Sequence, residues 1–243
     1  MNKQFIFDLD DTLMWNQHDY SVAHLEFARW IIEKLGHKAP DVQTIINLEV
    51  EIDHAAVKEL GFTKERFPSS LQKTYKSICK SSGIVPNEND LENAYKIGLM
   101  AFSPNQWKSN VVEGSRAVLN YLKYNKKDKL VLLTKGDEEI QRSKIMTLEL
   151  DRLFDKKNIM IVPQKDEFIF DKFISKEYGR KQTYHVGNSI KSDVIPAINA
   201  EINIIYIPCE TWSYERDHQG IPQSSFLKQI ENISQIKDVY DFL

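Results

Sequence analysis

The sequence contains little glycine and cysteine, and it has no long apolar run. Only 9 of its 243 residues are glycine, against an average of about 7%, and none of them forms a G-x-G-x-x-G or Walker phosphate-binding loop. Two cysteines, Cys79 and Cys209, cannot make a disulfide framework and lack the paired spacing of a zinc site. No stretch approaches the roughly 18 apolar residues of a membrane span, and the N-terminus lacks an export pattern. We therefore expect no membrane partner and a cytoplasmic location.

Neither sign of charge dominates the composition. The chain has 32 lysine and arginine residues against 35 aspartate and glutamate residues, which gives a formal net charge of -3 at pH 7. This balance excludes a general polyanion binder that attracts its partner by its overall field, and we expect no nucleic-acid partner. Hydrophobic residues make up 42% and charged residues 28%, which excludes disorder as the main state.

Short apolar runs alternate with helical-looking segments through most of the chain. The runs are typical of buried strands and cover residues 3–7, 130–133, 159–162, 184–186 and 202–207. The helical segments cover residues 114–124, 138–150, 166–178 and 189–200. Such alternation predicts βαβ units, whose right-handed crossovers build a parallel sheet covered on both faces. The predicted fold class is α/β, a Rossmann-like three-layer core around a central, five-stranded parallel sheet.

The first strand breaks this rhythm, because about 100 residues separate it from the second, where an ordinary crossover needs only a few dozen. Helical segments with stop signals fill the gap, at residues 21–35, 41–60, 69–80 and 89–102. We predict an inserted α-helical domain over residues 15–107. Residues 1–14 and 108–243 would then form the α/β core domain.

The first strand runs directly into carboxylates, in the stretch FIFDLDDTL at residues 5–13. Ionised carboxylates beside a core must be paired or metal-bound. Asp8 and Asp10 are two residues apart, so they face the same side while the chain stays extended. The carboxyl end of a parallel strand is also where open α/β sheets bind ligands. The alternative is an Asp-rich turn that Thr12 caps.

This stretch resembles the first motif of the haloacid dehalogenase (HAD) superfamily, most of whose members are phosphatases. The later motifs of that family should then follow the later strands in order. The candidates are LLTKGD at residues 132–137, IVPQKDE at residues 161–167 and HVGNSIKSD at residues 185–193. The resemblance runs from Lys3 to about Trp212, and the place of the inserted helices is that of the helical-cap branch of the family.

The resemblance implies a phosphatase that works through an aspartyl phosphate. It makes Asp8 the nucleophile and Asp10 the general acid and base, which protonates the leaving alkoxide and then activates water. It also implies a Mg²⁺ ion, held by the Asp8 side chain, the backbone carbonyl of Asp10 and a ligand from the fourth motif. The implied substrate is a small phosphorylated metabolite.

Three further residues are implied in binding the phosphoryl group. Thr134 would donate a hydrogen bond to a phosphoryl oxygen, helped by the backbone N–H of Lys135. We expect the Lys135 side chain itself to be a solvated charge. Lys165 would hold Asp8 and the phosphate by its charge, and the alternative for this residue is an exposed lysine in a polar loop.

The fourth motif departs from the family pattern at one position. Asn188 stands where an acidic metal ligand is usual, and Asp193 follows five residues later at the second acidic position. An asparagine carbonyl can still bind Mg²⁺, or Asp193 can be the direct or water-mediated ligand. In the alternative view, Gly187 and Asn188 form a turn in which Asn188 caps a helix that begins at Ser189, and Asp193 is an exposed residue of that helix.

These features together predict a Mg²⁺-dependent phosphatase that acts on a small phosphate monoester. The alternatives are a phosphomutase with the same aspartyl phosphate and a binding module with a degenerate metal site, for which Asn188 is the only hint. A dehalogenase is disfavoured, because the haloacid enzymes of the family lack the second acid of the first motif and Asp10 is present. His185, inside a strand, is predicted to be a satisfied core residue and not a base.

Overall fold

The computed structural model describes residues 2–174, 177–209 and 220–243, and these residues form two compact units. One unit consists of Met1–Gln17 and Pro104–Leu243, and the other of His18–Ser103. Trp212, to which the resemblance was traced, lies outside the described residues.

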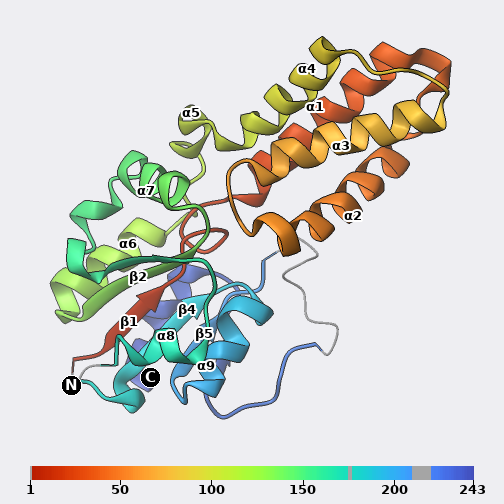
Figure 1. Cartoon of the computed structure of the whole chain (residues 1–243). Coiled ribbons are helices and arrows are strands. Elements are labelled where there is room, and N and C mark those ends of the chain that lie inside the picture. The colour runs from red at the N-terminus through yellow and green to blue at the C-terminus, as the bar shows by residue number, and fades with distance from the viewer. Residues whose placement is uncertain (1, 175–176, 210–219) are drawn as a thin grey trace. The chain divides into compact units, whose positions relative to one another are not determined.

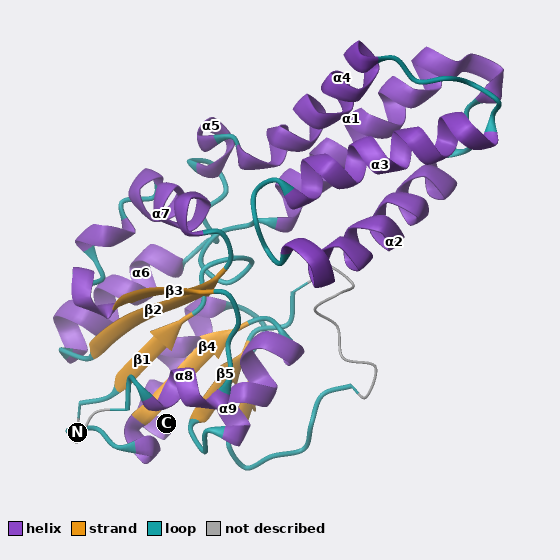
Figure 2. Cartoon of the chain, in the orientation of Figure 1, coloured by secondary structure: helices purple, strands orange, loops and turns teal. Residues whose placement is uncertain are grey.

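The first unit is built on a parallel sheet (Figures 1 and 2). Among the described residues the sheet has six strands in the order β3-β2-β1-β4-β5-β6. The strands are β1 Gln4–Phe7, β2 Lys129–Lys135, β3 Ile159–Val162, β4 Thr183–Gly187, β5 Asn203–Tyr206 and β6 Leu227–Gln229. The α/β prediction is confirmed. The predicted number of five strands is wrong, because β6 is a three-residue edge strand without the apolar run that marks the others.

Strand β1 lies inside the sheet, where all four of its residues are buried. Phe5 of β1 pairs with Leu130 of β2 on one side and with Tyr184 of β4 on the other. Because parallel strands share one direction, the carboxyl ends of β2, β1 and β4 meet at the same edge of the sheet. The residues that follow these three strands are therefore neighbours.

Helices cover both faces of this sheet, as its alternating side chains require. Ile6 packs in a cluster with residues of α8 and α9, including Phe170 and Ala197. Phe5 points to the opposite face, where its ring stacks on that of Tyr240, with the centroids 6.2 Å apart. The central layer is thus buried on both sides, and its carboxyl edge is the place where polar side chains gather.

The helices of this unit are short. They are α5 Pro104–Trp107, α6 Ser115–Asn120, α7 Glu138–Thr147, α8 Glu167–Asp171, α9 Ile195–Asn199 and α10 Ile236–Val239. A π-helical segment, Tyr121–Lys126, extends α6, and another, Ile190–Val194, precedes α9. The predicted helix over residues 166–178 is wrong in extent, because α8 ends at Asp171.

The second unit is helical in all its long elements. It contains most of α1 Gln17–Leu35, together with α2 Val42–Leu60, α3 Arg66–Ser81 and α4 Glu88–Leu99. Asp41 and Asn87 cap α2 and α4 by accepting backbone N–H groups at 3.0 and 2.8 Å. Gly61 ends α2 at φ 63, a value that favours glycine. In the described part of the chain, no helix is both long enough and apolar enough to cross a membrane.

Candidate active site

The chain makes a tight turn directly after β1. The N–H groups of residues 12–14 all point at the carbonyl oxygen of Leu9, at distances of 2.9 to 3.4 Å. Asp11 adopts φ 57, in the left-handed region. The N–H of Asp8 still bonds to Val186 of β4, at 2.9 Å. The Asp8 carboxylate therefore lies at the very end of the strand, and Asp10 lies in the turn.

A buried lysine joins two carboxylates at this edge of the sheet. Lys165 follows β3, and its Nζ lies 2.5 Å from Asp8 Oδ1 and 2.6 Å from Asp193 Oδ1. Its side chain is only 2% exposed, and all three residues are buried. The sheet thus brings together residues from three of the four motifs. The alternatives of an exposed Lys165 and an exposed Asp193 are wrong.

Each oxygen of Asp193 has two nitrogen neighbours. Oδ1 contacts Lys165 and, at 2.8 Å, Nε2 of His185. Oδ2 accepts the backbone N–H groups of Asn188 and Ser189, at 3.1 and 2.9 Å. A carboxylate has about four lone-pair sites, and Lys165, Asn188 and Ser189 donate to three of them, so Asp193 is less open to a direct bond to a metal than Asn188 is.

Gly187 makes this arrangement possible. A Cβ atom added there would overlap the side chain of Asp193, which folds back under the turn after β4. The turn itself is capped by Ser189, whose side chain accepts the N–H of Ser192 at 2.9 Å. The alternative in which Asn188 is the cap is therefore wrong.

Thr12 faces Asp8 and Asn188 at once. Its Oγ1 lies 3.3 Å from Asp8 Oδ2 and 3.3 Å from Asn188 Oδ1, so both oxygens border the same small region. Thr12 is buried, and its single hydroxyl proton faces these two side-chain oxygens, which is more than the capping of an Asp-rich turn. Of the two candidate ligands in the fourth motif, Asn188 is the one whose oxygen converges with that of Asp8.

The donor set at this point suits Mg²⁺. Carboxylate, amide and backbone oxygens are the ligands that Mg²⁺ prefers, and it usually keeps several waters and uses only one or two carboxylates. Within the described ranges, no three His, Cys, Asp or Glu side chains are grouped in a way that could hold a metal. A site here would therefore rest on Asp8, Asn188, a backbone carbonyl and water.

The buried charges shift each other's pKa values. Burial raises the pKa of the Asp8 carboxyl to about 7, because loss of water outweighs the attraction of Lys165, and the charges of Asp193 and Asp10 add to the rise. Burial would also raise the pKa of Asp193, but Lys165 and His185 outweigh it and hold that pKa well below its usual range. Asp193 is thus the permanent partner of Lys165, and Asp8 is the group that gains or loses a proton.

His185 supports the cluster from inside β4. Its Nδ1 lies 2.9 Å from the carbonyl oxygen of Ile6, and its Nε2 contacts Asp193. Burial lowers the pKa of this imidazole, which disfavours a role as a solvent-facing base. The prediction that His185 is a satisfied core residue is confirmed.

Asp10 is held by two side chains of α7 that belong to none of the sequence motifs. Lys144 Nζ lies 2.7 Å from Asp10 Oδ1, and Gln141 Nε2 lies 3.0 Å from Oδ2. Gln141 Nε2 also lies 2.5 Å from Thr134 Oγ1, so it links the predicted acid and base to the predicted phosphate ligand. The available signal was periodicity, because both residues share the buried face of α7 with Ile145.

Lys135 is not the solvated charge that was expected. It is half-buried, and its Nζ donates to Ser192 Oγ at 2.7 Å. Since β2 and β4 flank β1, this side chain reaches from the end of one flanking strand to the turn after the other. A second ammonium therefore lies across the end of β1, in addition to Lys165.

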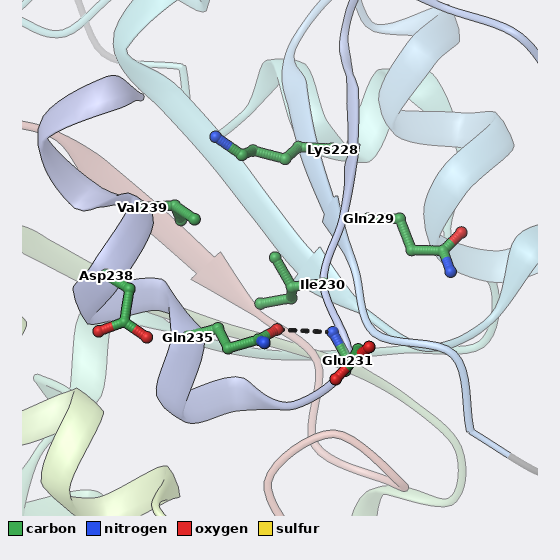
Figure 3. A pocket seen from close by; sticks show the side chains of 7 residues that line it. All are labelled: Lys228, Gln229, Ile230, Glu231, Gln235, Asp238 and Val239. Atoms are coloured by element: carbon green, nitrogen blue, oxygen red, sulfur yellow. Dashed lines mark hydrogen bonds between the residues drawn. The ribbon is translucent and has the colours of Figure 1, made fainter.

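A separate hollow lies beside β6 and α10. Figure 3 shows its lining, which consists of Lys228, Gln229, Ile230, Glu231, Gln235, Asp238 and Val239. At its edge the backbone N–H of Glu231 donates to Gln235 Oε1, at 2.8 Å. None of these lining residues belongs to the cluster around Asp8.

Comparison with solved structures identifies the fold. No family model and no curated protein matches the sequence. A haloacid dehalogenase-like family hydrolase from Xanthomonas campestris superposes with a TM-score of 0.73, over 99% of this chain and 95% of that chain, at 22% identity. The chain has the haloacid dehalogenase-like fold.

Two further structures with this fold align over 99% of both chains at 16% identity. One is a protein from Bacillus subtilis assigned to the HAD-hydrolases and bound to magnesium, with a TM-score of 0.60. The other is a protein from Thermotoga maritima assigned as a β-phosphoglucomutase, with a TM-score of 0.61. The predicted resemblance to the HAD superfamily is thus confirmed at the level of the fold.

The raised pKa of Asp8 predicts that Asp8→Asn stabilises the metal-free protein at pH 8. A carboxyl with a raised pKa stabilises the folded state fully below its unfolded value of 3.8, and this contribution is lost as the pH rises through about 7. The amide has no such loss, so we expect the gain in the free energy of unfolding to be largest at pH 8, smaller at pH 5, and absent well below pH 3.8. Urea unfolding with a chelator at the three pH values measures it.

The control for this experiment is Asp151→Asn, which changes an exposed carboxyl of the same unit. It should leave the free energy of unfolding within about 0.5 kcal/mol of the wild type. A loss of stability in Asp8→Asn at pH 8, beyond that of the control, would contradict the raised pKa.

Proposed function

We propose that the protein is a Mg²⁺-dependent phosphatase that hydrolyses small phosphate monoesters through an aspartyl phosphate on Asp8. The observation that carries the proposal is the buried contact of 2.5 Å between Asp8 and Lys165, at the carboxyl end of a central parallel strand. A carboxylate beside a fixed cation at this edge suits attack on an anionic phosphoryl group. Asp193 keeps the cation in place when Asp8 is modified.

Thr134 is the first ligand that we assign to the phosphoryl group. Its Oγ1 accepts from Gln141 Nε2, so its own hydroxyl proton is available for a phosphoryl oxygen. The backbone N–H of Lys135 is the second donor in this assignment, and Lys165 supplies positive charge. These groups would hold phosphorus in line with the Asp8 carboxylate, which is where most of the rate gain of phosphoryl transfer arises.

Asp10 would move the protons in both halves of the reaction. As Asp8 forms its bond to phosphorus and the P–O bond to the alcohol breaks, Asp10 gives its proton to the leaving alkoxide. It then takes a proton from the water that attacks the aspartyl phosphate, which releases phosphate and restores Asp8. Its side chain retains 24% exposure, which leaves it within reach of substrate and water.

Asp8, the backbone carbonyl of Asp10 and Asn188 would hold the Mg²⁺ ion. When bound, the ion supplies positive charge that reduces the repulsion between the nucleophilic carboxylate and the phosphoryl group. The magnesium in the Bacillus subtilis structure of the same fold supports this assignment. Asn188 in place of an acid makes the site less negative by one charge, which predicts modest affinity for the ion.

The gathering of four predicted residues at one edge argues against a degenerate binding module. Asp8 and Lys165 are in direct contact there, and Asp10 and Thr134 are joined through Gln141. A phosphomutase with the same nucleophile would pass the phosphoryl group to a sugar hydroxyl and not to water. Release of inorganic phosphate in the absence of any sugar acceptor distinguishes the phosphatase from the mutase.

Asp8→Asn should abolish the release of phosphate from 4-nitrophenyl phosphate, because an amide cannot form the aspartyl phosphate. We expect kcat to fall by at least about 10⁴-fold. In the wild type, we expect kcat to fall to a similar extent when the added Mg²⁺ is replaced by a chelator. Asp151→Asn serves as the control. An active Asp8→Asn variant would show that another group is the nucleophile.

Asp10→Asn should lower turnover while substrate binding stays intact. The amide cannot transfer protons, so we expect kcat to fall by about 10²- to 10⁴-fold. Inorganic phosphate should still inhibit or bind with a Kd close to that of the wild type, as measured by calorimetry. Unchanged turnover would remove Asp10 from the proton transfers.

Asn188→Asp should strengthen Mg²⁺ binding by about tenfold, because it adds a negative charge to the proposed ligand set. Calorimetric titration with Mg²⁺ measures the change independently of activity. The matched control is Asn125→Asp, at an exposed position of the same unit. Equal Mg²⁺ affinity in the two variants would mean that Asn188 does not contact the ion.

A further inference from the structure

Two side chains of α7, Gln141 and Lys144, hold Asp10 but take no part in the proposed reaction steps. Lys144 donates to one oxygen of the Asp10 carboxylate and Gln141 to the other, at 2.7 and 3.0 Å. They are three residues apart on one helix, so they lie on the same face. Each carboxylate oxygen thus has its own donor, and both donors belong to one rigid element.

The helix that carries these donors is itself fixed at its start. Asp137 caps α7 by accepting two backbone N–H groups, at 3.0 and 3.2 Å. Gly136 precedes it at φ 145, and a Cβ there would come within 3.3 Å of the Gln141 side chain. The loop between β2 and α7 is thus built so that Gln141 can turn back toward Thr134 and Asp10.

Packing alone does not account for Lys144. Its side chain is 4% exposed, and burying an ammonium is costly unless a partner compensates for the lost water. Asp10, at 24% exposure, does not need Lys144 to remain solvated. An apolar residue at position 144 would extend the buried face of α7, so the lysine is better explained by what it does to Asp10.

We propose that Gln141 and Lys144 are positioning residues, which fix the Asp10 carboxylate in the orientation needed for proton transfer. The inference rests on the proposed function, in which Asp10 protonates the leaving oxygen. Two donors at two oxygens fix both torsions of a short side chain that would otherwise change rotamer in a partly exposed turn. A misplacement of about 1 Å in a reacting group can cost about 10²-fold in rate.

The same donors tie Asp10 to two other parts of the unit. Gln141 also contacts Thr134, so the proton-transfer group and the proposed phosphate ligand share one amide. Lys144 also donates to Asn16 Oδ1 at 2.8 Å, and the backbone N–H of Asn16 bonds to Asp11 at 2.8 Å. The orientation of Asp10 is thereby coupled to the stretch of chain that follows the turn after β1.

Substrates with different leaving groups separate positioning from general stability. Phenyl phosphate needs a proton on its leaving oxygen, whereas 2,4-dinitrophenyl phosphate, with an acidic leaving group, does not. In Lys144→Met and Gln141→Met we expect kcat/KM, which reports formation of the aspartyl phosphate, to fall about 10²-fold for the first substrate. For the second it should fall less than about threefold, since proton donation no longer limits the step.

Arg142→Met is the matched control. It removes a cation from the same helix, but Arg142 is 58% exposed and pairs with Glu138, so both substrates should react as in the wild type. Equal losses on both substrates in Lys144→Met and Gln141→Met would overturn the inference, because a merely structural defect does not select between leaving groups. If Lys144→Met fails to fold, Gln141→Met carries the same expectation without removing a buried charge.

Crystal structures of the wild type and of the two variants test the inference without activity. We expect the Asp10 carboxylate to keep both contacts in the wild type and to turn to another rotamer when one donor is lost. An unmoved Asp10 in both variants overturns the inference. A wild type that hydrolyses no phosphate ester would instead overturn the proposed function, so the two failures are distinguishable.

Discussion

One buried ammonium group, Lys165, makes the candidate site possible. Without it, Asp8 and Asp193 would be two buried carboxylates at the same edge of the sheet. One of them would then have to stay protonated or move out to solvent. With it, Asp193 stays ionised, and the remaining imbalance of one negative charge falls on Asp8. That imbalance is what a proton or a divalent cation can offset. The site is therefore stable at rest and still receptive to a charged ligand.

The fold and the positions of the motifs could be predicted because both follow from short apolar runs. A run such as residues 130–133, set between helical segments, is typical of a buried strand, and in a parallel sheet the polar residues that follow such strands lie at the common edge. Strand β6 escaped prediction because its sequence, Leu-Lys-Gln, carries no such run. Its pairing is decided by the neighbouring strand β5 and not by its own residues.

The identities of side-chain partners depend on packing that no local pattern encodes. The choice between Asn188 and Asp193 stayed open in the sequence, and it is the absence of a Cβ at Gly187 that lets Asp193 fold back and use its oxygens on other donors. Lys135 looked like a surface charge because its partner, Ser192, is 57 residues away in the chain. Gln141 looked like an ordinary helix residue for the same reason, since Asp10 is 131 residues away.

Asn16 fixes the length of chain between the turn after β1 and helix α1. It bonds through its backbone to Asp11 and through its side chain to Lys144, one residue before α1 begins. The bonds that hold Asp10 and Asp11 therefore also fix the number of residues between Met14 and Gln17. A residue gained or lost in this stretch would change the orientation of Asp10 from outside the site while every motif residue stays the same.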